Sequence, residues 1–262
     1  KEYFIQKDRI AYSGEAHSAI KKLNEDQEKV FSEIKSLFET KDLALLHGVT
    51  SSGKTEVYVK LIKELLIKGK QVLYMLPEIA LTTQLIVRLQ KYFGDKIVVY
   101  HSKYSNNERV EIWKNVLEKK AKAQLIIGAR SSLFLPFSDL GLVIVDEEHE
   151  PSFKQYSPAP RYHARDSAVV LTKLHKAKIL LGSATPSLES FHNAKSEKFG
   201  LVTLKKRYGN VMMPDIEIVD IKEKHHKKKM TGHFSDTLLE EINNSLNNKE
   251  QIMLFQNRRG YS

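Results

Sequence analysis

The chain has 262 residues and a formal net charge of +10, from 42 Lys and Arg against 32 Asp and Glu. That length suits one large domain or two small ones, and 41% hydrophobic residues exclude global disorder. The absence of cysteine excludes disulfides, thiolate zinc sites and cysteine nucleophiles. No apolar run approaches the roughly 18 residues of a membrane span, so no membrane partner is expected. The basic excess is compatible with a polyanionic partner such as nucleic acid.

Short apolar runs alternate with amphipathic stretches in the larger part of the chain. Strands without polar alternation are typical of a sheet that is buried on both faces, and interleaved helices predict parallel strands. We therefore expect an α/β fold with a mainly parallel sheet flanked by helices, and a ligand site at the carboxyl ends of the strands. The predicted strands are 42–48, 71–77, 96–102, 124–129, 141–147 and 178–184, and the predicted helices are 55–69, 79–93, 107–120 and 164–176.

The pattern changes after residue 205, where a second α/β unit is expected to begin. We predict a strand over 214–220, a solvated basic loop over 221–230, a helix over 235–248 and a strand over 251–257. The first twenty residues match neither unit. The expected organisation is therefore a linker or the tail of a preceding region (1–20), a first unit (21–205) and an incomplete second unit (206–262).

A phosphate-binding loop lies between the first predicted strand and the first predicted helix. The segment 48–55 fits the pattern G-x-x-x-x-G-K-[ST]. Its glycines allow backbone N–H groups to face phosphate oxygens, and the helix N-terminus adds positive potential. We expect Lys54 to reach the β- and γ-phosphates and Thr55 to bind Mg²⁺. The predicted nucleotide-binding residues here are Gly48, Thr50, Ser51, Ser52, Gly53, Lys54 and Thr55.

An acidic pair follows the apolar strand at 141–147. Asp146 is placed to hold Mg²⁺, and Glu147 is placed to orient and deprotonate an attacking water. Hydrolysis of a nucleoside triphosphate needs both roles, because the metal neutralises phosphate charge while another group handles the nucleophile. These two acids and the phosphate loop together predict an ATP-hydrolysing site.

The segments HGVTSSGKTEVY, DEEH and GSATPS, in that order, resemble superfamily 2 helicases of the DExH type. PEIALTTQ (77–84), VVYHS (98–102), GARSSLFLPF (128–137), DEEHEPSFKQ (146–155) and NRRGYS (257–262) are similar to the PriA family of replication-restart helicases. This resemblance implies two RecA-like lobes with ATP between them, so that residues 21–205 are lobe 1 and residues 206–262 begin lobe 2.

The resemblance also assigns roles to single residues. It makes His149 a catalytic-motif residue that connects nucleotide state to neighbouring motifs. The SAT motif (Ser183, Ala184 and Thr185) is expected to link hydrolysis to movement along DNA, and Gln27 to recognise adenine. The candidate DNA contacts are Thr82, Thr83, Arg130, Ser131 and Ser132, and, in an aromatic-rich loop that follows DEEH, Phe153, Lys154, Tyr156, Arg161 and Tyr162.

The activity that the resemblance implies is ATP- and Mg²⁺-dependent 3′→5′ unwinding of single-stranded and forked DNA. Primosome proteins and single-strand binding protein are the implied partners, in the bacterial cytoplasm at the nucleoid. No zinc site is expected in this chain, because the family's zinc-binding cysteines follow NRRGY. The arginine finger of lobe 2, which contributes about 10³–10⁵ in rate, is also absent. We expect the chain to bind ATP·Mg²⁺ weakly without useful turnover, and the parent protein to be the ATPase.

Four alternatives stay open at this point. One is a RecG-like DNA translocase and another is a restriction-type DNA translocase. A third is a nucleotide- and DNA-binding module without activity. A small-molecule kinase is the fourth, although the SAT motif and the placement of DEEH argue against it.

Overall fold

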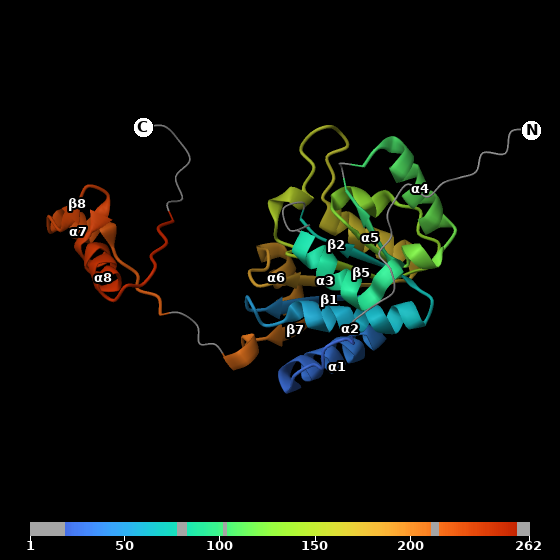
Figure 1. The fold of residues 1–262 in the computed structure, drawn as a ribbon, viewed down its shortest axis with the longest axis horizontal. Helices are drawn as coiled ribbons and strands as arrows, with labels where there is room; N and C mark the ends of the chain where they lie inside the picture. Colours follow the sequence, from blue (N-terminus) through green and yellow to red (C-terminus); the bar gives the residue numbers. More distant parts are fainter. Residues whose placement is uncertain (1–18, 78–82, 102–103, 211–214, 256–262) are drawn as a thin grey trace, which may run out of the picture. The chain divides into compact units, whose positions relative to one another are not determined.

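A seven-stranded β-sheet organises the first unit of the computed structural model, which describes residues 19–77, 83–101, 104–210 and 215–255 (Figure 1). All pairings in this sheet are parallel, and the order is β3-β4-β2-β5-β6-β1-β7. The carboxyl ends of the strands therefore meet at one edge. The strands are β1 (Leu43–Gly48), β2 (Gln71–Met75), β3 (Ile97–Tyr100), β4 (Leu125–Gly128), β5 (Leu140–Asp146), β6 (Lys178–Ser183) and β7 (Gly200–Leu204).

Helices cover both faces of this sheet. One face carries α1 (Glu25–Thr40), α2 (Lys54–Ile67) and α3 (Thr83–Phe93), and the other carries α4 (Asn106–Leu117), α5 (Ala164–His175) and α6 (Leu188–Lys195). Successive strand side chains point to opposite faces, so Leu45 and Leu46 are both fully buried but belong to different cores. This two-sided burial explains the continuous apolar strands and confirms the predicted α/β, RecA-like fold class.

The predicted elements of the first unit are confirmed where the structure describes them, with small shifts at their ends. The helix predicted over 79–93 is described from Thr83 onward, and the end of the strand predicted over 96–102 lies outside the described residues. Three elements were missed: α1, β7 and α6. β7 lies at the edge of the sheet, where Thr203 faces solvent, so it lacks the continuous apolar run of the central strands.

The chain divides into two compact units between Val211 and Met212. The second unit contains α7 (Ile221–His226), β8 (Met230–Thr231), β9 (Phe234–Ser235) and α8 (Asp236–Asn247). The helix predicted over 235–248 is confirmed, and the Ser235 hydroxyl caps it by accepting from the Leu238 N–H at 3.2 Å. The loop predicted over 221–230 is partly wrong, because α7 begins after Asp220, whose carboxylate accepts from two N–H groups of its first turn.

Two predicted strands of the second unit are wrong in their described parts. Residues 215–220 and 251–255 form no strand, and Ile218 and Met253 are 91% and 93% exposed. A strand persists only when its N–H and C=O groups pair with a neighbour, which neither segment has among the described residues.

Among all the residues that the structure describes, no helix combines the length and hydropathy needed to cross a bilayer.

Candidate functional site

The phosphate loop joins β1 to α2, as predicted. Gly53 has a φ of 84°, in the left-handed region that favours glycine. A Cβ atom at Gly53 would lie 2.2 Å from Gln27 Nε2, and one at Gly48 would lie 2.8 Å from Lys54 Cγ. Gly53 is therefore required by its positive φ, and a side chain at Gly48 would collide with Lys54 of the same loop. The Ser52 hydroxyl is buried without a hydrogen-bond partner among the described residues, a polar atom left for a ligand.

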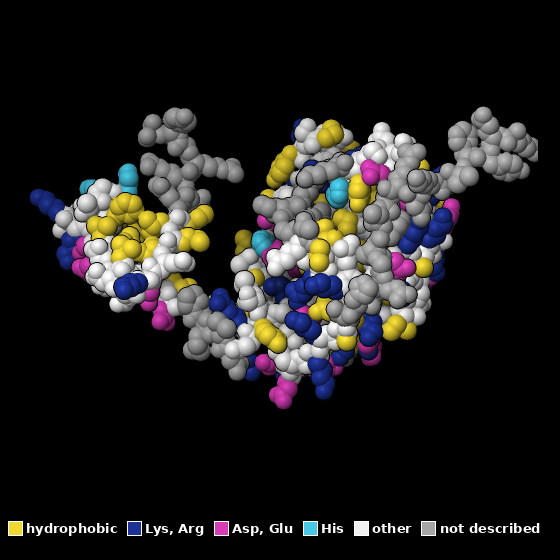
Figure 2. Space-filling view, in the orientation of Figure 1, with side chains coloured by type: hydrophobic (Ala, Val, Ile, Leu, Met, Phe, Trp, Pro, Cys, Tyr) yellow, Lys and Arg dark blue, Asp and Glu magenta, His cyan; other side chains and the backbone are white. Residues whose placement is uncertain are grey.

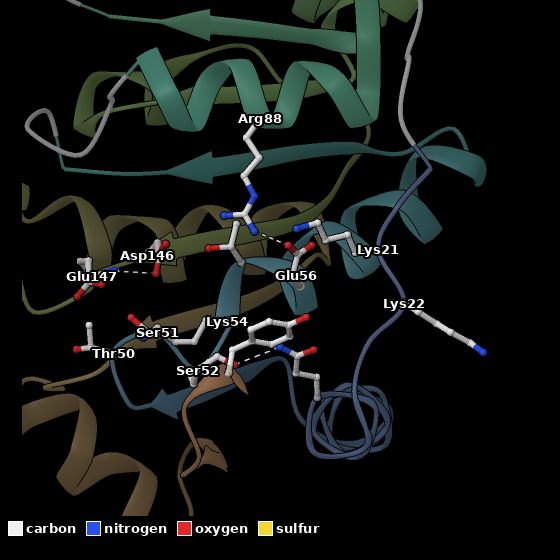
Figure 3. Close-up of a pocket in the computed structure, with 14 residues that line it drawn as sticks. Lys21, Lys22, Thr50, Ser51, Ser52, Lys54, Glu56, Arg88, Asp146 and Glu147 are labelled. Atoms are coloured by element: carbon white, nitrogen blue, oxygen red, sulfur yellow. Dashed lines mark hydrogen bonds and ion pairs between the residues drawn. The ribbon is translucent and has the colours of Figure 1, made fainter. Parts of the chain in front are cut away.

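A cavity of about 470 Å³ opens beside this loop. Lys and Arg side chains gather on the face of the first unit that Figure 2 shows, and four of them line the cavity: Lys21, Lys22, Lys54 and Arg88. The Lys54 ammonium donates to the Gly48 carbonyl at 2.8 Å, so it is folded back over the loop (Figure 3). The predicted residues that line the cavity are Gln27, Thr50, Ser51, Ser52, Gly53, Lys54, Thr55, Asp146 and Glu147, and the lining residues that were not predicted include Lys21, Lys22, Glu56, Arg88 and Tyr208.

Asp146 and Glu147 lie at the end of β5, across the cavity from the loop (Figure 3). Burial raises the pKa of Asp146, as does the charge of Glu147, while hydrogen bonds from Tyr74 and Tyr58 and the charge of Lys54 oppose the rise. Glu147 has a φ of 50° and a side chain that is 41% exposed. Backbone in this region is strained for a non-glycine residue and is common at functional sites. The turn holds one acid close to the sheet and leaves the other accessible.

His149 connects the acidic motif to the SAT motif. Its Nδ1 lies 2.8 Å from Ser183 Oγ and its Nε2 lies 3.3 Å from Thr185 Oγ1. His149 Nδ1 also lies 3.7 Å from a carboxylate oxygen of Glu147. Ser183 Oγ accepts from the Thr185 N–H at 2.9 Å, which fixes the turn around Ala184. The structure thus brings together the residues that the sequence predicted to be linked.

Glu148, which was not predicted, is the centre of a buried polar network. Its side chain is fully buried, and one oxygen accepts from Arg165 Nη1 at 2.8 Å and Ser190 Oγ at 2.8 Å. The other oxygen accepts from the Ser187 N–H at 2.7 Å. Although burial works against it, hydrogen bonds to Asp166 and Glu148 raise the pKa of Arg165. The network ties the acidic motif to the first turns of α5 and α6.

Gln27, which was predicted to recognise adenine, has a structural role in the described residues. Its side chain closes a capping box with Asn24 at the start of α1, and its Nε2 donates to the Ser52 carbonyl at 3.2 Å. Gln27 is 1% exposed. An amide offers two N–H donors and two acceptor lone pairs, so one donor and one lone pair remain beyond these bonds.

The candidate DNA contacts before the acidic motif differ in accessibility. Arg130 Nη1 donates to the backbone carbonyls of Ser152 and Lys154, so it holds the aromatic-rich loop. Ser132 is fully buried and donates to the Ala129 carbonyl at 2.6 Å, which corrects its predicted role, whereas Ser131 is exposed. Thr82 lies outside the described residues, as does the side chain of Thr83.

The aromatic-rich loop is anchored at one end and open at the other. Phe153 is 1% exposed and packs into the core, so the prediction that it stacks on a base is wrong. The loop backbone bends back on itself, and the Lys154 ammonium donates to the Arg161 carbonyl at 3.1 Å. Tyr162 packs edge-on against Phe134, with ring centroids 5.0 Å apart. Tyr156 is 68% exposed and is the open aromatic face of the loop.

Tyr208 was missed because it approaches the cavity from after β7, far along the chain from the phosphate loop. Its N–H donates to the Ser51 carbonyl at 2.9 Å, and its side chain is exposed and lines the cavity. Arg88 of α3 pairs with Glu56 of α2 in the same cavity (Figure 3). No local motif surrounds either residue, since only the tertiary fold brings them to the phosphate loop.

Curated proteins of one kind match most of this chain. Replication restart protein PriA of Rickettsia felis is 47% identical over 241 residues, which cover 92% of this chain and 36% of that protein. PriA of Bacillus subtilis is 39% identical over 242 residues, which cover 92% of this chain and 30% of that protein. The chain therefore spans about a third of the length of these curated relatives. The resemblance to PriA proteins is confirmed.

The structure of RecG bound to a three-way DNA junction superimposes with a TM-score of 0.52 at 23% identity, over 76% of this chain and 25% of that one. That likeness shows a shared fold alone. The RecG-like alternative is therefore less supported than the resemblance to PriA, which rests on 39–47% sequence identity. The family model for DEAD/DEAH box helicases matches residues 24–194, which is more than half of the chain. The chain therefore belongs to the DEAD/DEAH box helicase family.

Proposed function

We propose that this chain is the ATP-binding core of a DNA helicase that acts in replication restart. Residues 21–205 form its first RecA-like lobe and residues 206–262 begin the second. The observation that carries the proposal is the convergence of Lys54, Asp146 and Glu147 on one cavity at the carboxyl ends of parallel strands. Movement 3′→5′ on single-stranded and forked DNA, with primosome proteins and single-strand binding protein at the nucleoid in the cytoplasm, extends this proposal to the whole protein.

The residues around the cavity suit ATP and Mg²⁺. The loop N–H groups and Lys54 hold the phosphates, and Thr55 and Asp146 hold the metal. A carboxylate has about four lone-pair sites, and three on Asp146 accept from Tyr58, Tyr74 and the Glu147 N–H, which leaves one for a ligand. Bound Mg²⁺ would neutralise charge on the phosphates. Glu147 accepts a proton from water, and His149 relays the state of this turn to the SAT motif.

The DNA path that we propose crosses the open side of the aromatic-rich loop. Tyr156 is exposed for stacking on an unpaired base, and Arg161 and Ser131 are exposed for phosphate contacts. Lys154 and Tyr162 border the same loop, and Arg130 supports it through two backbone carbonyls. Thr82 and Thr83 stay predictions, and Ser132 and Phe153 are left out because they are buried.

The test is a titration of the chain with a fluorescent ATP analogue, mant-ATP, in the presence of Mg²⁺. Phosphate release is measured in the same samples with and without single-stranded DNA. We expect saturable binding that ADP displaces, without release at a useful rate. Release stimulated by DNA would contradict the expectation of no useful turnover. Failure to bind any nucleotide would contradict the proposed site itself.

Tyr208→Ala is expected to weaken binding of mant-ATP by about 10-fold. Stacking of a base on an aromatic ring contributes about 1–3 kcal/mol, and Tyr208 is the exposed aromatic ring that lines the cavity among the described residues. Inorganic tripolyphosphate has no base, so its affinity reports phosphate binding alone. It is measured by displacement of mant-ATP from the parent chain and from Tyr208→Ala. Tyr208→Phe is the matched control and keeps affinity. Equal loss of ATP and tripolyphosphate affinity in Tyr208→Ala would contradict a contact to the base.

A further inference from the structure

Tyrosine hydroxyls from two different elements hold both oxygens of the Asp146 carboxylate. Tyr58 of α2 donates to Oδ1 at 3.2 Å, and Tyr74 of β2 donates to Oδ2 at 2.9 Å. We propose that these two tyrosines are positioning residues for the magnesium ligand, which they orient as a clamp. This inference rests on the proposed function, because it assumes that Asp146 meets Mg²⁺ in the nucleotide site.

Burial and ring packing hold both tyrosines in place beside Asp146. Their side chains are fully buried, and their rings pack edge to face with centroids 5.8 Å apart. Burial raises the pKa of each phenol well above its ordinary value, and the nearby charge of Asp146 raises it further. Each hydroxyl donates a hydrogen bond to a different oxygen of the Asp146 carboxylate. The packing of the two rings also leaves the hydroxyls little freedom to turn away.

A glycine of the neighbouring strand makes room for one arm of the clamp. Gly182 of β6 lies opposite Asp146 in the parallel pairing. A Cβ atom at Gly182 would lie 1.8 Å from the Tyr58 hydroxyl oxygen and 3.3 Å from Asp146 Oδ1. Any other residue at this position would push the hydroxyl off the carboxylate. The glycine that precedes the SAT motif is therefore explained by the contact between Tyr58 and Asp146.

The consequence for metal binding follows from the geometry of a carboxylate ligand. With both oxygens fixed, the lone pair that remains keeps one direction, and no rotational freedom is lost when the metal binds. Without the hydroxyls, only the Glu147 N–H among the described residues still donates to this carboxylate, at 3.2 Å from Oδ1, so Oδ2 is no longer held. Removal of groups that orient metal ligands typically costs about 10- to 100-fold in metal affinity or activity. Loss of the clamp is therefore expected to act on Mg²⁺, not on nucleotide phosphates that contact the loop.

The test is the double substitution Tyr58→Phe and Tyr74→Phe, which removes two hydroxyl groups and keeps both rings. Binding of mant-ATP is measured at increasing Mg²⁺ and in EDTA. We expect the Mg²⁺ concentration for half-maximal enhancement to rise by about 10-fold or more, with affinity in EDTA unchanged within about twofold. Tyr100→Phe removes a hydroxyl at the end of β3 in the same sheet and is the matched control.

Several results separate this inference from the proposed function. The clamp would be overturned if the double variant needed the same Mg²⁺ concentration for half-maximal enhancement as the parent chain. It would also be overturned if Mg²⁺ did not enhance mant-ATP binding by the parent chain. A parent chain that binds no nucleotide would overturn the clamp and the proposed function together. Thermal unfolding checks that the variants fold. Tyr74→Phe alone should raise the Mg²⁺ concentration for half-maximal enhancement by a smaller factor than the double substitution. Gly182→Ala should reproduce the effect of Tyr58→Phe on Mg²⁺, because the added methyl group displaces the hydroxyl.

Discussion

Arg165→Met is expected to lower the free energy of unfolding of the first unit by about 3–5 kcal/mol. The substitution leaves the fully buried Glu148 carboxylate without its guanidinium partner. It also removes the donor that reaches the Ser187 hydroxyl at 2.7 Å. Breaking a buried ion pair from one side is costly, because the remaining charge stays out of water. Urea unfolding followed by fluorescence of Trp113, the single tryptophan, reports on this unit.

A matched variant tests whether burial is the cause. Lys206 pairs with Asp26 at 3.1 Å, with side chains that are 68% and 44% exposed. Lys206→Met should cost less than about 1 kcal/mol, as exposed pairs do. Adding Glu148→Gln to Arg165→Met should recover part of the loss, because it removes the buried charge. A loss below 1 kcal/mol for Arg165→Met would show that solvent reaches Glu148, contrary to its burial.

The sequence predicted the parts of the site that depend on short segments. The phosphate loop lies within eight consecutive residues, Gly48 to Thr55, between a strand and a helix. Asp146 and Glu147 follow an apolar strand directly, and in a parallel sheet such ends meet at one edge. Ser183, which the family resemblance singled out, is the last residue of β6, beside β5. For these residues, local pattern and sheet topology are enough to bring them together.

The residues that support the site could not be predicted in this way. Tyr58 and Tyr74 are ordinary apolar-face positions in the sequence. The pairing of β2 with β5 brings Tyr74 to Asp146, and the packing of α2 against β5 brings Tyr58 there. Arg165 follows the aromatic-rich loop and is one of several basic residues in that part of the sequence, yet it is buried against Glu148. The prediction for Phe153 was wrong for the same reason, because composition does not tell which aromatic ring of a loop packs into the core. These assignments depend on tertiary packing.

Lys54→Ala is expected to raise the Kd of mant-ATP with Mg²⁺ by about 100-fold. Hydrogen bonds to charged groups contribute about 1.5–3 kcal/mol each, and a lysine ammonium offers three donors to phosphate oxygens. Lys54 already makes a bond to the Gly48 carbonyl at 2.8 Å, which a nucleotide must replace. The loss of this bond reduces the binding free energy that Lys54 contributes. That bond joins the ammonium to a neutral carbonyl, whereas a phosphate oxygen carries negative charge, so the exchange favours the phosphates.

Lys60→Ala is the control for this prediction, because it removes a lysine from the same helix. Lys60 contacts Glu28 at 2.6 Å and does not line the nucleotide cavity. Its loss should leave the Kd unchanged within about twofold. Lys54 lies close enough to Asp146 for its charge to lower the pKa of that carboxyl, so the two residues face the same cavity. A Kd of Lys54→Ala that stays within about twofold of the parent value would contradict the contact between Lys54 and the phosphates.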